Sequence, residues 1–491
     1  ATIGGESLYG YPMRTVISES NNTNWDKAVL AMANVNIPYT YEKSLSLPYN
    51  VLHTDLKWST NTEDKKRASK YIESILLMLR TKVLLNNGDL SKTEIVWFYP
   101  ASMTQNRFNK FKAEWENTFA TLFGAPISNI IAASESVAPY YYHKAKKGAT
   151  STVVSVDIGG GTTDVLIVDK GEPKYLTSFR FAANTIFGDG YSYDSDSNGF
   201  VNKYKDIITN QLETNNLRGL KAVLKSVLDK RVSTDVIAFL FSLASNKEIK
   251  KEKVEINFAK MLADDNRGKY VVILFYVAIV YHIAKLMKAK GFDMPRHMTF
   301  SGNGSKVLNI LSTNDATLVR LTKIIFEEIY AQSYSIDGLD IIRPANSKES
   351  TCKGGIILTP FQSQDYGEIK DMKTILIGTD NEKFADVHMT YNDVTEADLD
   401  SVVDVIKEYI EFTFKLDKKF SFYDNFDVDR SIMNKVKDLC YRDIRTYLEN
   451  GLAIKKSEIA QDGADDNLEE TLFFYPLVGI INAVVRNIYQ M

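Results

Sequence analysis

The spacing of apolar residues predicts alternating strands and helices along most of the chain. Residues 1–60 are poorly patterned and are expected to form loops with short strands. The next segment predicts two helices, over 64–86 and 104–122. It also predicts two buried strands, over 94–99 and 127–132. Three strand-like runs then follow closely and predict an antiparallel meander, at 152–156, 165–168 and 175–181. The first turn of this meander contains three consecutive glycines.

Beyond the meander the pattern is mainly helical. Residues 200–265 are Lys-rich, and their charge run at 247–253 is expected to be a solvated face. A helix over 269–290 contains an apolar run too short for a membrane span, which favours a buried helix. A strand at 297–300 and a Gly-rich turn precede another helix. The remaining segments predict two strands, around Ile375 and Val387. They also predict three helices, near 396–412, 430–450 and 468–489.

The glycine turn of the meander combines groups that suit a phosphate and a magnesium ion. It reads Asp157-Ile158-Gly159-Gly160-Gly161-Thr162-Thr163-Asp164. Glycines let backbone N–H groups converge on a ligand without an intervening Cβ, and the threonines add hydroxyl donors. Asp157 and Asp164 supply acceptors for a hydrated Mg²⁺, which takes few direct protein ligands. The alternative is a plain hairpin turn, which would more often contain Asn-Gly or Asp-Gly.

The position of these glycines between two strands excludes two other phosphate-binding motifs. A Walker loop requires Gly-x-x-x-x-Gly-Lys-Ser/Thr at the start of a helix. The dinucleotide fingerprint likewise joins a strand to a helix.

Residues 157–164 resemble the second phosphate loop of the actin, sugar kinase and seventy-kilodalton heat-shock chaperone superfamily, with bacterial actin-like and chaperone-like members most similar. The resemblance covers about residues 65–358. It implies a two-lobe α/β fold of the actin-like ATPase type, with a repeated ribonuclease H-like motif and ATP and Mg²⁺ in the cleft. It also implies that Gly159, Gly160, Gly161, Thr162 and Thr163 bind phosphates, while Asp157 and Asp164 hold the metal through water.

Glu135 opens a predicted helix before the meander, where superfamily members carry Glu or Gln. Read alone, it is an ordinary acidic residue at a helix start, which is favourable against the helix dipole. The resemblance implies that Glu135 orients the attacking water, as one of three catalytic residues with Asp157 and Asp164.

The turn at 301–305 resembles the adenosine loop of the superfamily. The resemblance implies that five residues lie along the nucleoside: Gly302, Asn303, Gly304, Ser305 and Lys306. Asn303 stands where a second glycine is usual. Gly354 and Gly355 match small residues near the hinge between lobes, where they would allow close backbone packing.

Two features depart from the superfamily pattern. The first phosphate loop, a strand with Asp-x-Gly-x-Thr/Ser, is absent from residues 1–60, so either upstream residues are missing or the site is half built. The run at 373–380 superficially resembles a displaced first loop but lacks the aspartate before Gly378, which disfavours a circular permutation. The tail beyond Thr359 carries no catalytic constellation and is expected to pack on the core or to meet a partner, including another copy.

Composition excludes several other functions. With 59 basic and 62 acidic residues among 491, the net charge of −3 suggests no nucleic-acid partner. Cys352 and Cys440 lie far apart, form neither a disulfide framework nor a metal site, and fit a reducing, cytoplasmic compartment. The five histidines never fall at metal-ligand spacing, and His282 is expected as a satisfied core residue. No signal peptide is visible, and the chain begins at Ala1 without Met, which leaves processing or truncation open.

The sequence therefore predicts three regions: a first lobe over 1–148, a second lobe over 149–358 and an α-rich extension over 359–491. Three functions remain open. The first is a Mg-dependent ATPase switch whose lobes close with nucleotide state. The second is a non-hydrolysing nucleotide-binding, scaffold or filament protein with a degenerate site. The third is a sugar or acid phosphotransferase, for which we locate neither a catalytic Asp nor a substrate pocket.

Overall fold

The computed structural model describes residues 13–20, 30–36, 50–53, 56, 59, 61–100, 103, 105–147, 152–188, 190–191, 194–335, 338–344, 347–357, 389–462, 467–468 and 470–490. The chain folds into two compact units. The first unit comprises Ala1–Ile95, Asn109–Ile130 and Phe187–Met261, and the second comprises Val96–Phe108, Ile131–Ile186 and Leu262–Met491.

The first unit combines a small antiparallel sheet with helices. The sheet has the order β2-β1-β3, from β1 (Met13–Ser20), β2 (Leu30–Asn36) and β3 (Asn50–His53). Arg67 of α2 (Thr62–Leu85) forms a 2.6 Å ion pair with Glu19 of β1. The unit also contains most of α3 and four further helices: α3 (Gln105–Phe123), α6 (Gly199–Thr214), α7 (Arg218–Asp229), α8 (Ser233–Ser242) and α9 (Lys247–Lys251). The prediction that residues 200–265 are mostly helical is confirmed.

The second unit is built on a mixed five-stranded sheet. Its order is β10-β9-β6-β7-β8, from β6 (Val153–Ile158), β7 (Thr163–Asp169), β8 (Glu172–Phe179), β9 (His297–Ser301) and β10 (Asp340–Ile342). Strands β6, β7 and β8 form the predicted antiparallel meander. Strand β9 pairs parallel with β6 on one side and β10 on the other. A separate two-stranded sheet joins β4 (Ile95–Tyr99) to β5 (Ile130–Ser134).

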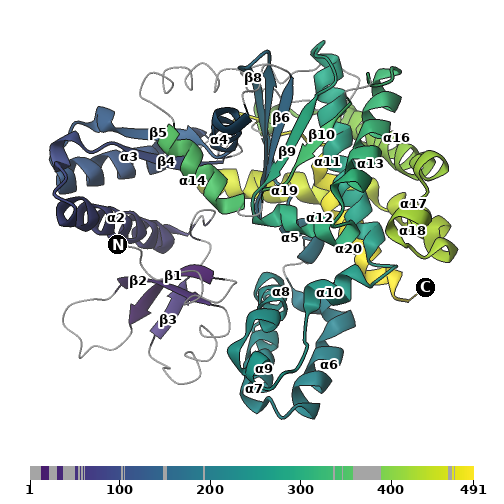
Figure 1. Ribbon diagram of the computed structural model, residues 1–491, viewed down its shortest axis with the longest axis horizontal. Helices are drawn as coiled ribbons and strands as arrows, with labels where there is room; N and C mark the ends of the chain where they lie inside the picture. Colours follow the sequence, from purple (N-terminus) through teal and green to yellow (C-terminus); the bar gives the residue numbers. More distant parts are fainter. Residues whose placement is uncertain are drawn as a thin grey trace. The chain divides into compact units, whose positions relative to one another are not determined.

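Helices cover both faces of the five-stranded sheet (Figure 1). On one face, α4 (Val137–Lys147) packs against α14 (Ser347–Ile357) and the meander. The apolar core there includes Val137 and Tyr140 of α4 and Val153, Leu166 and Val168 of the sheet. On the other face lies α11 (Lys269–Ala289), where Tyr276 packs on Phe300 of β9 with ring centroids 5.7 Å apart. Because both faces are covered, the strands read as nearly continuous apolar runs.

Helix α11 is buried, as predicted, but the expectation that its apolar run is too short for a membrane span was wrong. It is long and apolar enough to cross a membrane by length and composition, but 94% of its apolar window is buried inside the protein.

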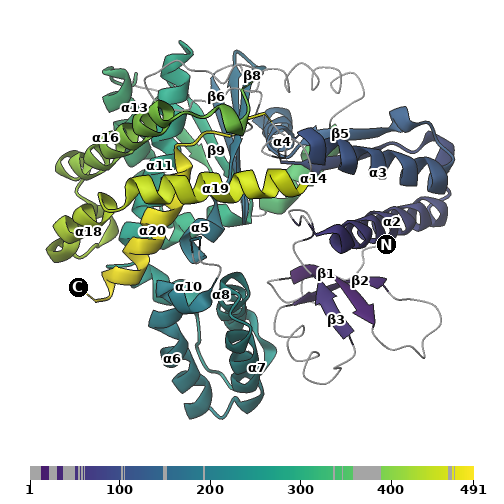
Figure 2. The ribbon, with the colours of Figure 1, turned by 180° about the vertical axis from the view of Figure 1, so that it is seen from behind.

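The C-terminal helices complete the second unit (Figure 2). They are α16 (Glu396–Phe420), α17 (Phe422–Phe426), α18 (Met433–Cys440), α19 (Ile444–Asp462) and α20 (Phe474–Ile488). Helices α16 and α20 pack on α11, while α18 and α19 pack on α16 and α20. The Tyr409 hydroxyl of α16 donates to the Leu274 carbonyl of α11 at 2.6 Å. The expectation that the tail packs on the core is confirmed. The predicted strands around Ile375 and Val387 and the run at 373–380 lie outside the described residues.

Two predicted helices have different limits in the structure. The single helix predicted near 430–450 is divided, because Asp443 has φ 55°, a left-handed conformation that a continuous α-helix does not contain. The helix predicted near 468–489 begins only at Phe474, since Asn467 bridges Thr390 instead.

The α/β class is confirmed, while the repeated motif is seen once among the described residues. The second unit contains a full five-stranded sheet, whereas the described strands β4 and β5 form only a pair. The lobe boundaries at 148 and 358 stay a prediction.

Candidate functional site

The three glycines form a tight hairpin turn between β6 and β7. Asp157 pairs with Asp164 and Ile158 with Thr163, and the Gly159 N–H donates to the Thr162 carbonyl at 2.8 Å. Gly160 and Gly161 are exposed at the tip. The turn therefore presents bare backbone to solvent at the end of the meander.

A row of polar residues crosses the sheet below this turn. The strand registers place Asp157 opposite Asp164, Asp164 opposite Ser178, and Asp157 opposite Ser301. Directly opposed residues share one face of a sheet, so both carboxylates belong to the same face. Asp164 is buried, whereas Asp157 is partly exposed. Of the two, Asp157 is the better placed to meet a solvated ligand.

The predicted nucleoside turn lies directly against the glycine turn. Gly302 has φ 79°, and a Cβ there would lie 2.1 Å from the Ile158 carbonyl oxygen and 2.2 Å from Asp157 Oδ1. A Cβ on Gly304 would lie 2.1 Å from the Gly159 carbonyl oxygen. Two turns far apart in sequence are thus in backbone contact, which only glycine permits at these positions.

A short helix supports the glycine turn through backbone hydrogen bonds. The N–H groups of Ala183 and Asn184, at the start of α5 (Ala183–Phe187), donate to the carbonyls of Gly159 at 3.3 Å and Gly160 at 2.8 Å. The sequence did not indicate this support. The backbone bonds that create it leave no local signal in the sequence.

Two hydroxyls of the predicted site are used inside the protein. The Thr163 hydroxyl donates to the Phe181 carbonyl at 2.6 Å, and Thr163 is fully buried. The Ser305 hydroxyl donates to the Gly302 carbonyl at 2.7 Å and closes the nucleoside turn. These side chains shape the two turns. The sequence predicts that both residues bind the ligand, whereas in the structure the hydroxyl of each donates to a backbone carbonyl. Of the remaining nucleoside residues, Lys306 is exposed and Asn303 partly exposed.

Helix α14 also contacts the site, at Asp157. The hydroxyl of Thr351 lies 3.5 Å from Asp157 Oδ2, a contact that the sequence did not indicate. The helix approaches closely because of its glycines. A Cβ on Gly354 would lie 1.8 Å from the Ala138 carbonyl oxygen of α4, and one on Gly355 would lie 2.5 Å from Phe98 Cζ. The close packing predicted for both glycines is confirmed.

Glu135 lies between β5 and the start of α4. Its backbone N–H donates to the Tyr99 carbonyl of β4 at 3.0 Å, and its side chain is partly exposed. Neighbouring Ser134 and Ser136 are buried, with their hydroxyl oxygens 2.7 Å apart. The structure brings the two turns and the two aspartates together, and it places Glu135 just before α4, the helix that packs against α14. Its catalytic role stays a prediction.

A preformed multidentate metal centre is absent from the part of the chain that the structure describes, where no three His, Cys, Asp or Glu side chains gather. His282 is buried as expected, but its Nδ1 makes no hydrogen bond, and burial lowers the pKa of His282 to about 3.

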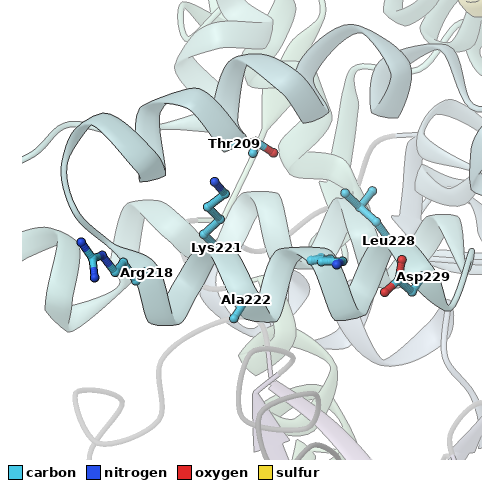
Figure 3. Close-up of a pocket in the computed structure, with 7 residues that line it drawn as sticks. Thr209, Arg218, Lys221, Ala222, Leu228 and Asp229 are labelled. Carbon is cyan, nitrogen blue, oxygen red and sulfur yellow. The ribbon is translucent and has the colours of Figure 1, made fainter.

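A separate hollow of about 450 Å³ lies on the first unit between α6 and α7 (Figure 3). Its lining is Thr209, Arg218, Lys221, Ala222, Lys225, Leu228 and Asp229. Lys221 forms a 2.8 Å ion pair with Glu213. The basic residues recur at helical spacing on α7, which fits a solvated helix face.

Comparison with known proteins gives structural similarity alone. Neither a protein-family model nor a curated protein matches the sequence. The structure is similar to ethanolamine utilization protein EutJ from Carboxydothermus hydrogenoformans, with 12% identity, a TM-score of 0.31, and coverage of 67% of this chain and 81% of that chain.

It is also similar to MreB5 of Spiroplasma citri bound to ADP and to AMPPNP. The identities are 13% and 14%, the TM-scores 0.33 and 0.34, and the coverage 71% and 72% of this chain and 89% and 90% of those chains. TM-scores this low support no conclusion about function.

Proposed function

We propose that this protein binds ATP as its magnesium complex at the paired glycine turns, and that it hydrolyses ATP as a nucleotide-dependent switch. The observation that carries the proposal is the backbone contact between the turns, in which Gly302 and Gly304 lie against residues 157–159. This contact leaves one stretch of backbone without side chains next to a partly exposed carboxylate. Converging backbone N–H groups beside an acidic residue suit a phosphate chain that carries a divalent cation.

The residues present fit such a ligand. Exposed Gly160 and Gly161 offer backbone N–H groups to phosphate oxygens, and Gly302 and Gly304 let the second turn lie against the first. Asp157, with the Thr351 hydroxyl nearby, would accept hydrogen bonds from water on the metal. When bound, Mg²⁺ would neutralise charge on the phosphate oxygens. Lys306, exposed beyond the nucleoside turn, would lie along the base.

For hydrolysis we assign Glu135 the role of orienting water. In phosphoryl transfer a polar side chain can act in this way while metal and backbone donors stabilise the charge. The partial exposure of Glu135 at the start of α4 leaves its carboxylate accessible to water. Movement of the lobes with nucleotide state would require a ligand with different affinities for the open and closed forms.

Calorimetric titration with ATP, with and without Mg²⁺, tests the binding step. We expect metal-dependent binding by the native chain and a loss of metal dependence in Asp157→Asn, which keeps the shape but removes the charge. Asp229→Asn is the matched control, because Asp229 is an exposed carboxylate at the hollow between α6 and α7, away from the two turns in sequence. Equal binding by Asp157→Asn and the native chain would contradict the proposal.

A nucleotide-binding protein that does not hydrolyse ATP is the second candidate. It is favoured by the limited extent of the sheet containing β4 and β5, which has two strands among the described residues. Phosphate release by the native chain and by Glu135→Gln separates the candidates. A switch ATPase releases phosphate and loses turnover but not binding in Glu135→Gln, whereas the second candidate binds ATP without turnover in either form.

A further inference from the structure

A partly buried charged cluster connects the C-terminal helices to the end of β8. We define the Arg180 cluster as Arg180, Glu458, Glu470, Lys455, Tyr475 and Tyr391. The Arg180 backbone N–H donates to Glu470 Oε2 at 2.8 Å, and its Nη1 donates to Glu458 Oε2 at 2.6 Å. Glu470 is completely buried although it lies 290 residues from its partner.

The other oxygen of Glu470 also has partners. The Tyr475 hydroxyl donates to Glu470 Oε1 at 3.1 Å, and Lys455 Nζ lies 3.5 Å from the same atom. Lys455 is 3% exposed, and its Nζ stands 5.5 Å from the centre of the Tyr391 ring. Burial of several charges is costly, and an apolar cluster of similar volume is often at least as stable. A contribution to stability therefore does not explain why a carboxylate occupies this buried position.

The segment that Glu470 holds is the one that supports the glycine turn. Directly after Arg180, the Phe181 carbonyl accepts the Thr163 hydroxyl at 2.6 Å. The Ala183 and Asn184 N–H groups then donate to the Gly159 and Gly160 carbonyls. Residues 180–184 are thus attached to Glu470 on one side and to the phosphate turn on the other.

Aromatic packing makes this segment stiff between its two attachments. The Phe181 ring stacks on Phe275 of α11 with centroids 5.0 Å apart and lies 4.7 Å from Phe474 of α20. Phe179 stacks on Phe474 at 3.9 Å. Because α20 begins four residues after Glu470, the same part of the tail holds both the backbone and the rings of the segment.

We propose that Glu470 is a positioning residue for the phosphate turn, so that the C-terminal extension forms part of the nucleotide site through residues 180–184. The inference rests on the proposed function for its ligand. The positioning itself is a property of the free protein. The extension, which carries no catalytic constellation, then acts by fixing the carbonyls of Gly159 and Gly160 and with them the N–H groups that face a phosphate.

Amide hydrogen exchange of the free protein tests the positioning without a ligand. In Glu470→Ala the Arg180 N–H loses its acceptor, and we expect exchange at the hydrogen-bonded amides of Gly159 and Asn184 to become about tenfold faster. Glu470→Gln retains an acceptor oxygen at the same reach and should restore protection. Tyr409→Phe is the matched control, since it removes a different buried hydrogen bond of the extension and should leave the turn unchanged. Unchanged exchange in a folded Glu470→Ala would overturn the proposal.

Two further measurements keep the test decisive. If Glu470→Ala does not fold, Glu470→Asp replaces it, because the shorter carboxylate retains charge but loses reach. Faster turn exchange in Glu470→Asp than in Glu470→Gln supports positioning, and the reverse order overturns it. ATP titration should show about tenfold weaker binding by Glu470→Ala with little change in Glu470→Gln. If the native chain itself binds no ATP, the proposed function fails, while the exchange data still decide whether Glu470 positions the turn.

Discussion

At the scale of single residues, Gly160 and Gly302 differ in what the fold requires of them. A Cβ on Gly160 would make ordinary contacts, with its nearest neighbour 3.6 Å away on the Asn184 side chain. Gly302 has φ 79° and backbone 2.1 Å from the place of a Cβ. Folding therefore explains the glycine at 302 but not at 160, where the approach of a ligand is the remaining explanation.

The first prediction compares alanine at these two positions. Gly160→Ala should change the free energy of unfolding by less than about 1 kcal/mol. It should weaken ATP binding, because the methyl group would stand where phosphate approaches. Gly302→Ala should lower the free energy of unfolding by about 1–3 kcal/mol, because the backbone must shift. Denaturant unfolding and calorimetry measure both effects. Native ATP affinity in Gly160→Ala would remove the ligand explanation.

The second prediction concerns the pH dependence that Lys455 introduces. Burial lowers the pKa of Lys455 to about 8, with Arg180 adding to the effect while Glu470 and Glu458 oppose it. The pKa values of Tyr391 and Tyr475, which also face it, are raised well above their ordinary range, so both stay protonated here. Below pH 8 the folded protein must hold a buried cation. Between pH 8 and the unfolded pKa of 10.5, the unfolded chain binds more protons, so stability rises with pH.

Comparison with Lys455→Met isolates this contribution. The free energy of unfolding of the native chain, relative to the variant, should increase by about 3 kcal/mol in total as pH rises from 8 to 10.5. Urea unfolding at several pH values provides the measurement. A difference that stays constant with pH would show that Lys455 titrates normally.

At the scale of elements, the sequence was most informative where a signal is local. The meander, its glycine turn, the buried α11 and the small residues of α14 all follow from short patterns of residue type. The pairing of β9 with β6, which joins the two turns, depends on residues about 140 positions apart and was not predicted. Thr351 beside Asp157 and Glu470 beside Arg180 were missed, because a polar residue in a helix or loop looks the same whether or not a distant partner meets it.

The third prediction tests the close contact of α4 and α14. Gly354→Ala should destabilise the protein by about 1–3 kcal/mol, since the added methyl group would collide with the Ala138 carbonyl. Gly219→Ala is the matched control, because Gly219 lies in α7 with open space around its Cβ. There alanine should stabilise the protein by about 0.5–1 kcal/mol. Equal effects of the two substitutions on chemical unfolding would contradict the packing described for α14.

At the scale of the whole molecule, the two free cysteines report on different parts of the second unit. Cys352 of α14 is exposed, whereas Cys440 of α18 is completely buried, and burial raises the pKa of its thiol. The sequence correctly predicted two unpaired cysteines but did not distinguish their environments, which depend on how the C-terminal helices pack.

The fourth prediction is that one thiol per chain reacts with a colorimetric disulfide reagent in the native protein and two react in denaturant. The second thiol should react at the rate of unfolding, because the helices around α18 must separate first. Rapid reaction of both thiols without denaturant would show that the C-terminal helices do not pack as described.

The measurement that tests the central claim most directly is amide hydrogen exchange of the native chain with and without Mg·ATP. We predict that the nucleotide slows exchange at 158–162 and 302–306, the two turns that lie against each other. Protection of residues 209–229 around the hollow between α6 and α7, with no change at either turn, would place the ligand elsewhere and contradict the account.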